Sequence, residues 1–281
     1  MKKYLFNLII FAATLAAFSG CHIENDFGNY DNRPPSPPAN IYTVTGDNRV
    51  DLTWDENSER DVAGYNIYYS TSYNGKYTLI GSSETNYYID YGAENGVTCY
   101  YAVTAYDYDG NESELSEDVV YDTPRPEGFN QAIYDYLMYP SSSGYDFSSF
   151  AITPYDDDKT DFFFENYQGE YYLNVWDDSD IQDMGPTRDI YDIDRAPENG
   201  WSTTKDVRAA VGHTYVIWTW DNHFAKIRIK NITRDRVVFD WAYQSSNTEE
   251  GYRELKTSGG AKVRTHINAE VLKSRPGHRN P

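Results

Sequence analysis

Cysteine is scarce in this chain, which has only Cys21 and Cys99 among its 281 residues. This scarcity excludes a framework of several disulfides and a structural zinc site made of four cysteines. The sequence also contains no HExxH motif, no phosphate-binding glycine loop and no metal-spaced set of Cys and His. We therefore predict a protein that is not an enzyme and that holds neither a metal nor a cofactor.

Positive charge is in short supply as well, since 24 Lys and Arg face 44 Asp and Glu, for a formal net charge of −20. A nucleic-acid partner is excluded on this ground, because the phosphate backbone attracts clustered Lys and Arg. The charge is uneven. Residues 251–281 hold seven basic and two acidic residues, a surplus of five, which leaves −25 for residues 1–250. We expect residues 269–281 to be a basic, flexible, solvated tail, with contact to an anionic lipid or polymer as the alternative.

Long apolar runs are missing apart from one stretch, Tyr4 to Phe18. The stretch follows two lysines and precedes a Ser-Gly pair, which is the order of parts in a secretory signal peptide, and it is too short for a membrane-spanning helix. Because Cys21 comes directly after the small residues, residues 1–20 resemble the signal peptide of bacterial lipoproteins. The match departs from that pattern at Phe18, where the family prefers Leu.

The lipoprotein resemblance implies that the signal is cut before Cys21 and that this cysteine is then acylated. Acyl chains hold a protein at a bilayer surface, since each buried methylene contributes about 0.8 kcal/mol. His22 stands where an Asp would resemble a signal for retention in the inner membrane, so we expect the bacterial outer membrane, with the periplasmic or cell-surface side left open. The alternative is an ordinary signal peptide, with Cys21 in a disulfide with Cys99.

A Pro-rich linker, residues 21–38, precedes a first predicted domain at residues 39–123. The prolines favour a stiff polyproline stalk that holds this domain away from the membrane. Apolar and polar residues alternate at Val50–Trp54 and Tyr65–Tyr69, which predicts strands with one buried face. Asn74-Gly75 predicts a tight hairpin turn. Seven short strands in this length predict a two-sheet sandwich.

Two segments of this domain, VDLTWDENSERDVAGYNIYYS (Val50–Ser70) and GVTCYYAVTAYDYDGNESELS (Gly96–Ser116), resemble a bacterial fibronectin type III domain. The resemblance implies that Trp54 is the core tryptophan. Cys99 stands where the family usually has an inward tyrosine, so we expect a weaker corner before that strand. If Cys21 is acylated, Cys99 is left as a small buried hydrophobic residue.

A second domain follows a short linker, residues 124–130, and extends over residues 131–268. Its clearest element is a hairpin at Thr214–Ile229, with a two-residue turn at Asp221-Asn222, and the strand Arg236–Gln244 comes next. We therefore predict an all-β chain, in which a fibronectin type III sandwich is followed by a second antiparallel β-rich domain.

The hairpin and the next strand resemble the β-domain of hemophore-like (HmuY-like) haem-binding lipoproteins. The matching residues are Thr219, Asp221, Asn222, Phe224, Ala225, Lys226, Ile227, Tyr243 and Gln244. Haem iron takes His or Met ligands, which makes His223 the candidate ligand, beside Trp218 and Trp220. The two-residue turn pairs Trp220 with His223 and places His213 roughly 20 Å away on the opposite face, so these two histidines cannot clamp one iron. His223 with His266, or Met184 with either of them, remains open.

The same register places Trp218 and Trp220 on one face, which predicts packing in the core. Exposure for sugar stacking or for a protein interface is the alternative. Three acidic segments, Asp107–Ser113, Asp156–Asp158 and Asp177–Asp180, offer oxygen ligands to calcium. Clustered Asp is also ordinary in turns, which is the interpretation we favour.

These observations predict a membrane-anchored extracytoplasmic lipoprotein that acts as a non-enzymatic binding or structural protein, in adhesion or as a scaffold, with a protein or polysaccharide partner. The alternative is capture of haem or of a glycan by the second domain. A glycan-cleaving enzyme is disfavoured, because nothing in the sequence marks a cleft between two carboxylates.

Overall fold

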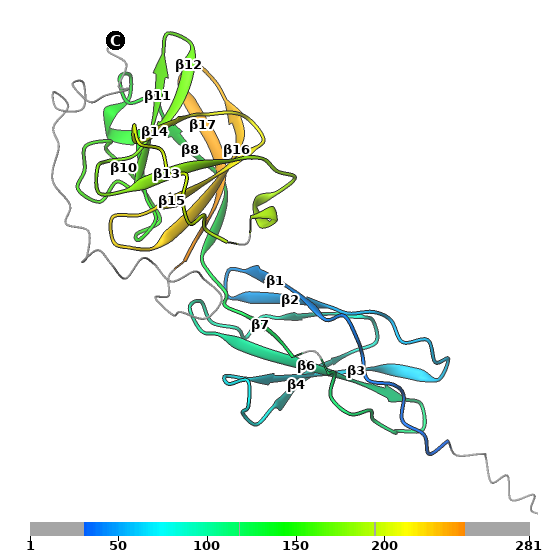
Figure 1. Ribbon diagram of the computed structural model, residues 1–281. Helices are drawn as coiled ribbons and strands as arrows, with labels where there is room; N and C mark the ends of the chain where they lie inside the picture. Colours follow the sequence, from blue (N-terminus) through cyan, green and yellow to red (C-terminus); the bar gives the residue numbers. More distant parts are fainter. Residues whose placement is uncertain (1–30, 118, 194, 245–281) are drawn as a thin grey trace, which may run out of the picture.

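The computed structural model describes residues 31–117, 119–193 and 195–244, and it shows two β-sheet modules that follow one another along the chain (Figure 1). The predicted signal at residues 1–20, Cys21, His266 and the basic tail at residues 269–281 lie outside the described residues. Within the described ranges, no helix is long and apolar enough to cross a membrane. The expected all-β fold class is confirmed.

The first module is a sandwich of a three-stranded sheet, in the order β1-β2-β5, and a four-stranded sheet, in the order β4-β3-β6-β7. This is the fibronectin type III-like architecture that the sequence predicts. Trp54 is buried in its core, beside Tyr65 at a ring-centroid distance of 5.2 Å. The strands are β1 (Tyr42–Gly46), β2 (Arg49–Thr53), β3 (Val62–Ser70), β4 (Thr78–Ser83), β5 (Tyr87–Asp90), β6 (Cys99–Asp107) and β7 (Val120–Asp122).

The connection between β3 and β4 differs from the expected tight turn. Tyr69 pairs with Thr78, so the loop covers residues 71–77 rather than Asn74-Gly75 alone. A hydrogen bond from the Gly75 amide to the Ser72 carbonyl, 2.9 Å long, forms a turn inside this loop. The Asn-Gly pair marks a turn but not the ends of the strands.

Cys99 is buried in the core of the first module as a free thiol, and burial raises its pKa above the ordinary value. The expected weak corner is compensated two residues further on. The buried Tyr101 hydroxyl donates a hydrogen bond of 2.9 Å to Asp90, at the end of β5. Tyr101 thus ties the start of β6 to the preceding strand.

The second half of the Pro-rich linker lies against the first module. Pro35 and Pro38 are buried, and the Ser36 amide donates to the Glu59 carboxylate at 2.9 Å. Hydrogen bonds from the Ser36 side chain and backbone lower the pKa of Glu59 to about 2, although Glu59 is largely solvated. A free stalk is therefore wrong for residues 31–38, which form an extended strap on the module.

The second module consists of two five-stranded sheets, in the orders β10-β9-β11-β12-β14 and β13-β15-β16-β17-β8. Side chains from both sheets form one core, rich in aromatic rings such as Tyr145, Phe162 and Phe239. The elements are β8 (Glu127–Tyr134), η1 (Pro140–Ser142), β9 (Gly144–Asp146), β10 (Ala151–Thr153), β11 (Phe162–Tyr167), β12 (Glu170–Asn174), β13 (Asp180–Pro186), η2 (Ile190–Asp192), β14 (Asp206–Arg208), β15 (His213–Trp218), β16 (Phe224–Ile232) and β17 (Arg236–Tyr243).

The expected linker at residues 124–130 is shorter in the structure, because β8 begins at Glu127 and pairs with β17. The connection between the modules is held from both sides. The Arg125 amide donates to the Gly46 carbonyl of the first module at 3.2 Å, and the Tyr243 amide of the second module donates to the Pro126 carbonyl at 2.9 Å.

The hairpin of β15 and β16 has a register one residue away from the expected one. Trp218 pairs with Phe224 and Thr214 with Arg228, so the two-residue turn is wrong and the loop contains one more residue. Asn222 adopts a positive φ of 71°, as the last residue of a three-residue hairpin loop commonly does. The Thr219 hydroxyl accepts the His223 amide at 3.0 Å and closes this loop.

We predict that Tyr101→Phe lowers the free energy of unfolding by about 1–3 kcal/mol, because the buried Asp90 carboxylate, only 8% exposed, loses a hydrogen-bond donor. Chemical denaturation measures this change. Tyr121→Phe is the control, since that ring is 46% exposed. Equal stability of both variants and the wild type would show that the Tyr101 hydroxyl does not stabilise the corner.

Candidate functional site

The outer face of the sheet β13-β15-β16-β17-β8 is covered by residues 187–201, which we call the covering segment (residue 194 is not described). Alternation along β16 sends Ala225 and Ile227 into the core and leaves Phe224, Lys226 and Arg228 on the outer face. A sheet with one aromatic and two long cationic side chains on its outer face is well suited to hold a segment that forms no strand with it.

Side chains of the sheet bind the covering segment through its main chain and its hydroxyl groups. Arg228 donates to the Thr187 carbonyl at 2.8 Å, and the Lys226 ammonium donates to the Ile193 carbonyl at 2.7 Å. The Tyr191 hydroxyl lies 3.1 Å from both carboxylate oxygens of Glu127, at the start of β8. Burial raises the pKa of Glu127 above its ordinary value.

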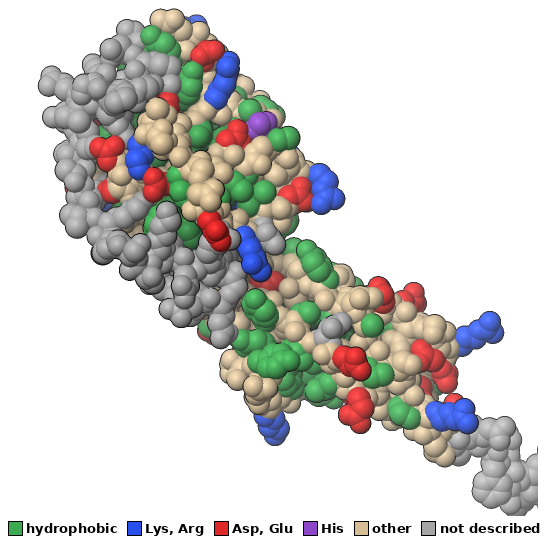
Figure 2. Space-filling view, viewed as in Figure 1, with side chains coloured by type: hydrophobic (Ala, Val, Ile, Leu, Met, Phe, Trp, Pro, Cys, Tyr) green, Lys and Arg blue, Asp and Glu red, His purple; other side chains and the backbone are tan. Residues whose placement is uncertain are grey.

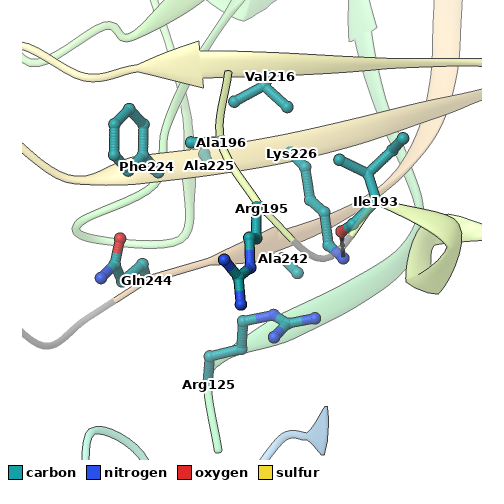
Figure 3. A pocket seen from close by; sticks show the side chains of 10 residues that line it. All are labelled: Arg125, Ile193, Arg195, Ala196, Val216, Phe224, Ala225, Lys226, Ala242 and Gln244. Atoms are coloured by element: carbon teal, nitrogen blue, oxygen red, sulfur yellow. Dashed lines mark hydrogen bonds between the residues drawn. The ribbon is translucent and has the colours of Figure 1, made fainter. Parts of the chain in front are cut away.

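A pocket with a cavity volume of about 40 Å³ remains between the covering segment and the sheet (Figure 3). Three cationic side chains line it: Arg125 from the connection between the modules, Arg195 from the covering segment and Lys226 from β16. Phe224 and Gln244 line it as well, and apolar side chains from the covering segment and the central strands complete the wall. Sequence reasoning missed this site, because its cations are scattered over a hundred residues.

Three half-buried aromatic rings lie side by side next to this pocket. Trp201 and Phe224 are parallel within 2° at a centroid distance of 6.2 Å, and Trp218 lies 6.1 Å from Trp201 and 5.9 Å from Phe224. The Trp218 indole donates to Asn222 at 3.0 Å, which fixes the orientation of its ring. We call Trp201, Trp218 and Phe224 the aromatic cluster. Phe224 belongs to both the cluster and the pocket.

The expected core packing of Trp218 and Trp220 is wrong. Both side chains are half-buried, and neither belongs to the aromatic core between the sheets. The expectation that His223 shares a face with Trp218 is wrong too. His223 contacts Tyr243, a core residue, at a centroid distance of 5.4 Å, whereas Trp218 lies on the outer face. The shifted register of the hairpin is the cause.

Asp221 is the centre of a hydrogen-bond network at the hairpin loop. Its carboxylate accepts from Ser148 at 2.5 Å, from Thr219 at 2.5 Å and from Tyr243 at 3.1 Å. His223 Nδ1 also lies 3.2 Å from Asp221 Oδ1. Burial alone would raise the pKa of Asp221, but the contacts with His223, Ser148 and Thr219 outweigh it and lower this pKa well below its ordinary value.

This network brings Ser, Asp and His together without forming a nucleophilic triad. In a triad the serine donates to the histidine, which the acid orients from its other side. Here Ser148 donates to Asp221 instead, and the acid stands between the other two residues. The arrangement therefore braces the loop and does not activate the Ser148 hydroxyl.

The haem hypothesis finds no matching geometry around His223. The neighbouring pocket, at about 40 Å³, is far below the roughly 300 Å³ or more of ordinary ligand pockets. His213 pairs with Asp183 at 3.0 Å on another part of the sheet. In the described part of the chain, no three His, Cys, Asp or Glu side chains gather as metal ligands.

The acidic segment Asp107–Ser113 forms a turn. The backbone amide and the side-chain amide of Asn111 donate to the two carboxylate oxygens of Asp107, each at 2.8 Å.

The first module carries a shallow groove of about 530 Å³ on its four-stranded sheet, lined by residues that include Tyr68, Tyr77 and Glu112. One oxygen of Glu112 accepts hydrogen bonds from Asn66 at 2.9 Å and from Tyr68 at 2.8 Å. Figure 2 shows a patch of hydrophobic side chains on this module, among scattered acidic and basic ones. The groove is a second aromatic surface, and a test of binding must distinguish it from the aromatic cluster.

We predict that Asp221→Asn lowers the free energy of unfolding by about 1–3 kcal/mol at pH 7, because buried donors lose a charged acceptor. A carboxylate whose pKa is lowered by folding contributes stability above its ordinary pKa of about 3.9, and this contribution is lost as the pH falls below it. Denaturation at pH 7 and pH 3 should therefore show a smaller difference between wild type and variant at pH 3. Asp156→Asn, at an exposed position, is the control. A cost that does not change with pH would contradict the prediction.

The known proteins to which this chain is similar match only part of it, and no protein-family model matches it. An amylopullulanase of Thermoanaerobacterium saccharolyticum is 36% identical over 120 residues, which are 42% of this chain and 9% of the relative. An amylopullulanase of Thermoanaerobacter thermohydrosulfuricus is 46% identical over 87 residues, 30% of this chain and 6% of the relative. The chain thus spans less than a tenth of the length of these relatives.

Among solved structures, an Fn3-like protein from Clostridium thermocellum is 28% identical, with a TM-score of 0.30, and covers 34% of this chain and 100% of its own. A β-1,2-glucanase from Parabacteroides distasonis is 28% identical, with a TM-score of 0.29, and covers 34% of this chain and 14% of its own. The solved-structure neighbours thus include fibronectin type III-like domains over part of the chain, and a stretch of this chain is homologous to a small segment of amylopullulanases.

Proposed function

We propose that the protein is a lipid-anchored envelope protein that binds a polysaccharide without cleaving it. The observation that carries the proposal is the aromatic cluster, which lies half-buried beside a pocket lined by three cationic side chains, one amide and several apolar side chains. Rings in such a position offer flat apolar faces to the C–H faces of sugars, while the polar groups around them meet hydroxyl groups. The first module serves as a spacer between the anchor and this site.

The relatives support the choice of a polysaccharide over other partners. The homologous segment belongs to proteins named amylopullulanases, which is the name of polysaccharide-degrading enzymes. Because the match covers 9% and 6% of those enzymes, the shared part is an accessory domain in this proposal and not the part that cleaves the chain. The bracing role of Asp221 likewise favours binding without catalysis.

We expect Cys21→Ser to release the protein from the membrane. Acylation requires the Cys21 thiol, and without acyl chains an acidic protein, with a formal net charge of −20 for the full sequence, has no stable hold on a bilayer. Fractionation of bacteria that express the full chain measures this, with Cys99→Ser as the matched control. Equal membrane recovery of the Cys21→Ser protein would overturn the anchor.

We expect Trp218→Ala to weaken polysaccharide binding about tenfold or more, since loss of a central aromatic ring typically costs over 1 kcal/mol of binding. Affinity electrophoresis of the chain from residue 21 onward, with Cys21→Ser, in gels containing pullulan, amylopectin or polygalacturonate measures retardation. Trp218→Phe, which keeps a ring, should retain most of the binding.

Two control variants locate the site in this experiment. Tyr108→Ala removes a ring that is 79% exposed, and it should change nothing. Tyr77→Ala alters the groove of the first module. If retardation depends on Tyr77 and not on Trp218, the aromatic cluster is not the site. If none of the polysaccharides retards the wild type, the proposed function is wrong.

A further inference from the structure

We infer that the pocket beside the aromatic cluster receives the carboxylate of an acidic sugar, so that the captured glycan carries uronate residues. The inference rests on the proposed function and names the ligand class of that same site. Its basis is the chemistry of the pocket wall, in which cationic donors and one buried acceptor face the same small space.

Arg195 supplies the strongest argument for an anion. Its guanidinium forms no hydrogen bond or ion pair with any described residue, and it lines the same small pocket as Arg125 (Figure 3). Two guanidinium groups repel each other unless an anion sits between them. The planar fork of an arginine matches a carboxylate with two parallel hydrogen bonds. Asp122 and Glu127 partly compensate Arg125, so Arg195 is the main source of attraction for a ligand.

Gln244 indicates that the ligand also carries a hydroxyl group. Its side chain is only 7% exposed, and within the described residues its Oε1 has no hydrogen-bond partner. A buried amide oxygen of this kind requires a donor, since leaving it without one costs about 1–3 kcal/mol. A carboxylate offers no proton, but the hydroxyl groups of a sugar acid do. The pocket thus offers a cationic partner for a carboxylate and an acceptor for a hydroxyl group, and a sugar acid carries both groups.

The size of the pocket agrees with a carboxylate and not with a whole sugar ring. A volume of about 40 Å³ holds about three water-sized groups, which is the number of heavy atoms in a carboxylate. The sugar ring then stays outside, where Phe224 forms the pocket wall and Trp201 and Trp218 lie beside it. Lys226, 8% exposed, fixes the opposite wall through its bond to the Ile193 carbonyl.

The net charge of −20 repels an acidic polymer at long range and so disfavours its approach to the protein. Salt screens charges beyond about 8 Å at physiological ionic strength, so the three cations around the pocket dominate the field inside it. Binding of a uronate should therefore weaken with added salt, whereas binding of a neutral sugar should not.

The test compares trigalacturonate with its methyl ester, which has the same rings but no charge. Both are titrated into the chain from residue 21 onward, with Cys21→Ser, and tryptophan fluorescence is followed, since Trp201 and Trp218 lie next to the site. We expect the acid to bind at least tenfold more tightly than the ester. Arg195→Ala should remove most of this difference. Because Arg195 is exposed, this variant should fold normally, and its thermal unfolding checks that.

Arg234→Ala is the matched control, because it removes an exposed arginine of the same module outside the pocket. It should leave the preference for the acid unchanged. Equal binding of acid and ester, with no effect of Arg195→Ala, overturns the inference and leaves the proposed function intact. Absence of binding to both oligosaccharides and to every polysaccharide overturns the proposed function. If inorganic phosphate or a peptide with a free carboxyl end binds and trigalacturonate does not, the pocket serves another anion and the inference is wrong.

Discussion

The hydrogen bond from the Lys226 ammonium to the Ile193 carbonyl, 2.7 Å long, is the contact on which the site in the second module depends. Lys226 as a residue is only 8% exposed, and burial of a charged group is costly unless other groups replace its water. The carbonyl replaces part of it, and the Tyr191 ring, 5.9 Å from the nitrogen, adds a cation–π contact. The covering segment supplies both groups, so the cost of burying the charge is offset only when this segment is in place.

This constraint explains why a pocket exists beside the covering segment. The segment is held by side chains at separate points and not by a continuous ladder of backbone hydrogen bonds, so small spaces remain between these points. Arg228 holds its start at Thr187, Lys226 holds its middle, and the stacking of Trp201 on Phe224 holds its end. The pocket lies between the second and the third of these contacts.

The sequence predicts the first module far better than the site. Alternation at Val50–Trp54 and Tyr65–Tyr69 is local, and β1–β2, β3–β4 and β6–β7 are pairs of consecutive strands, so short patterns are enough for most of this module. In the second module β8 pairs with β17, which lies about a hundred residues later in the chain. A short sequence pattern does not predict such a distant pairing. For that reason the sequence pattern predicts a linker where β8 begins at Glu127.

Two further predictions, the length of the β15–β16 loop and the weak corner before β6, are wrong for one physical reason. In both places a side-chain hydrogen bond determines the local structure, and the pattern of apolar and polar residues does not show it. At the β15–β16 hairpin, the bond between the Thr219 hydroxyl and the His223 amide favours a loop one residue longer than the Asp-Asn pair suggests. This one-residue shift reverses which face each side chain takes, and it separates His223 from Trp218. At the corner before β6, Tyr101 supplies a hydroxyl that the presence of Cys99 suggested was missing.

The pocket also shows that the first module does more than add length. Arg125 reaches the pocket from the connection between the modules, and its amide is bonded to Gly46 in the first module. On the other side, Glu127 begins β8 and meets Tyr191 of the covering segment. Since both modules hold this connection, the position of one pocket cation depends on how they are joined. A chain with a longer, unpinned connection would keep both folds and lose the placement of Arg125.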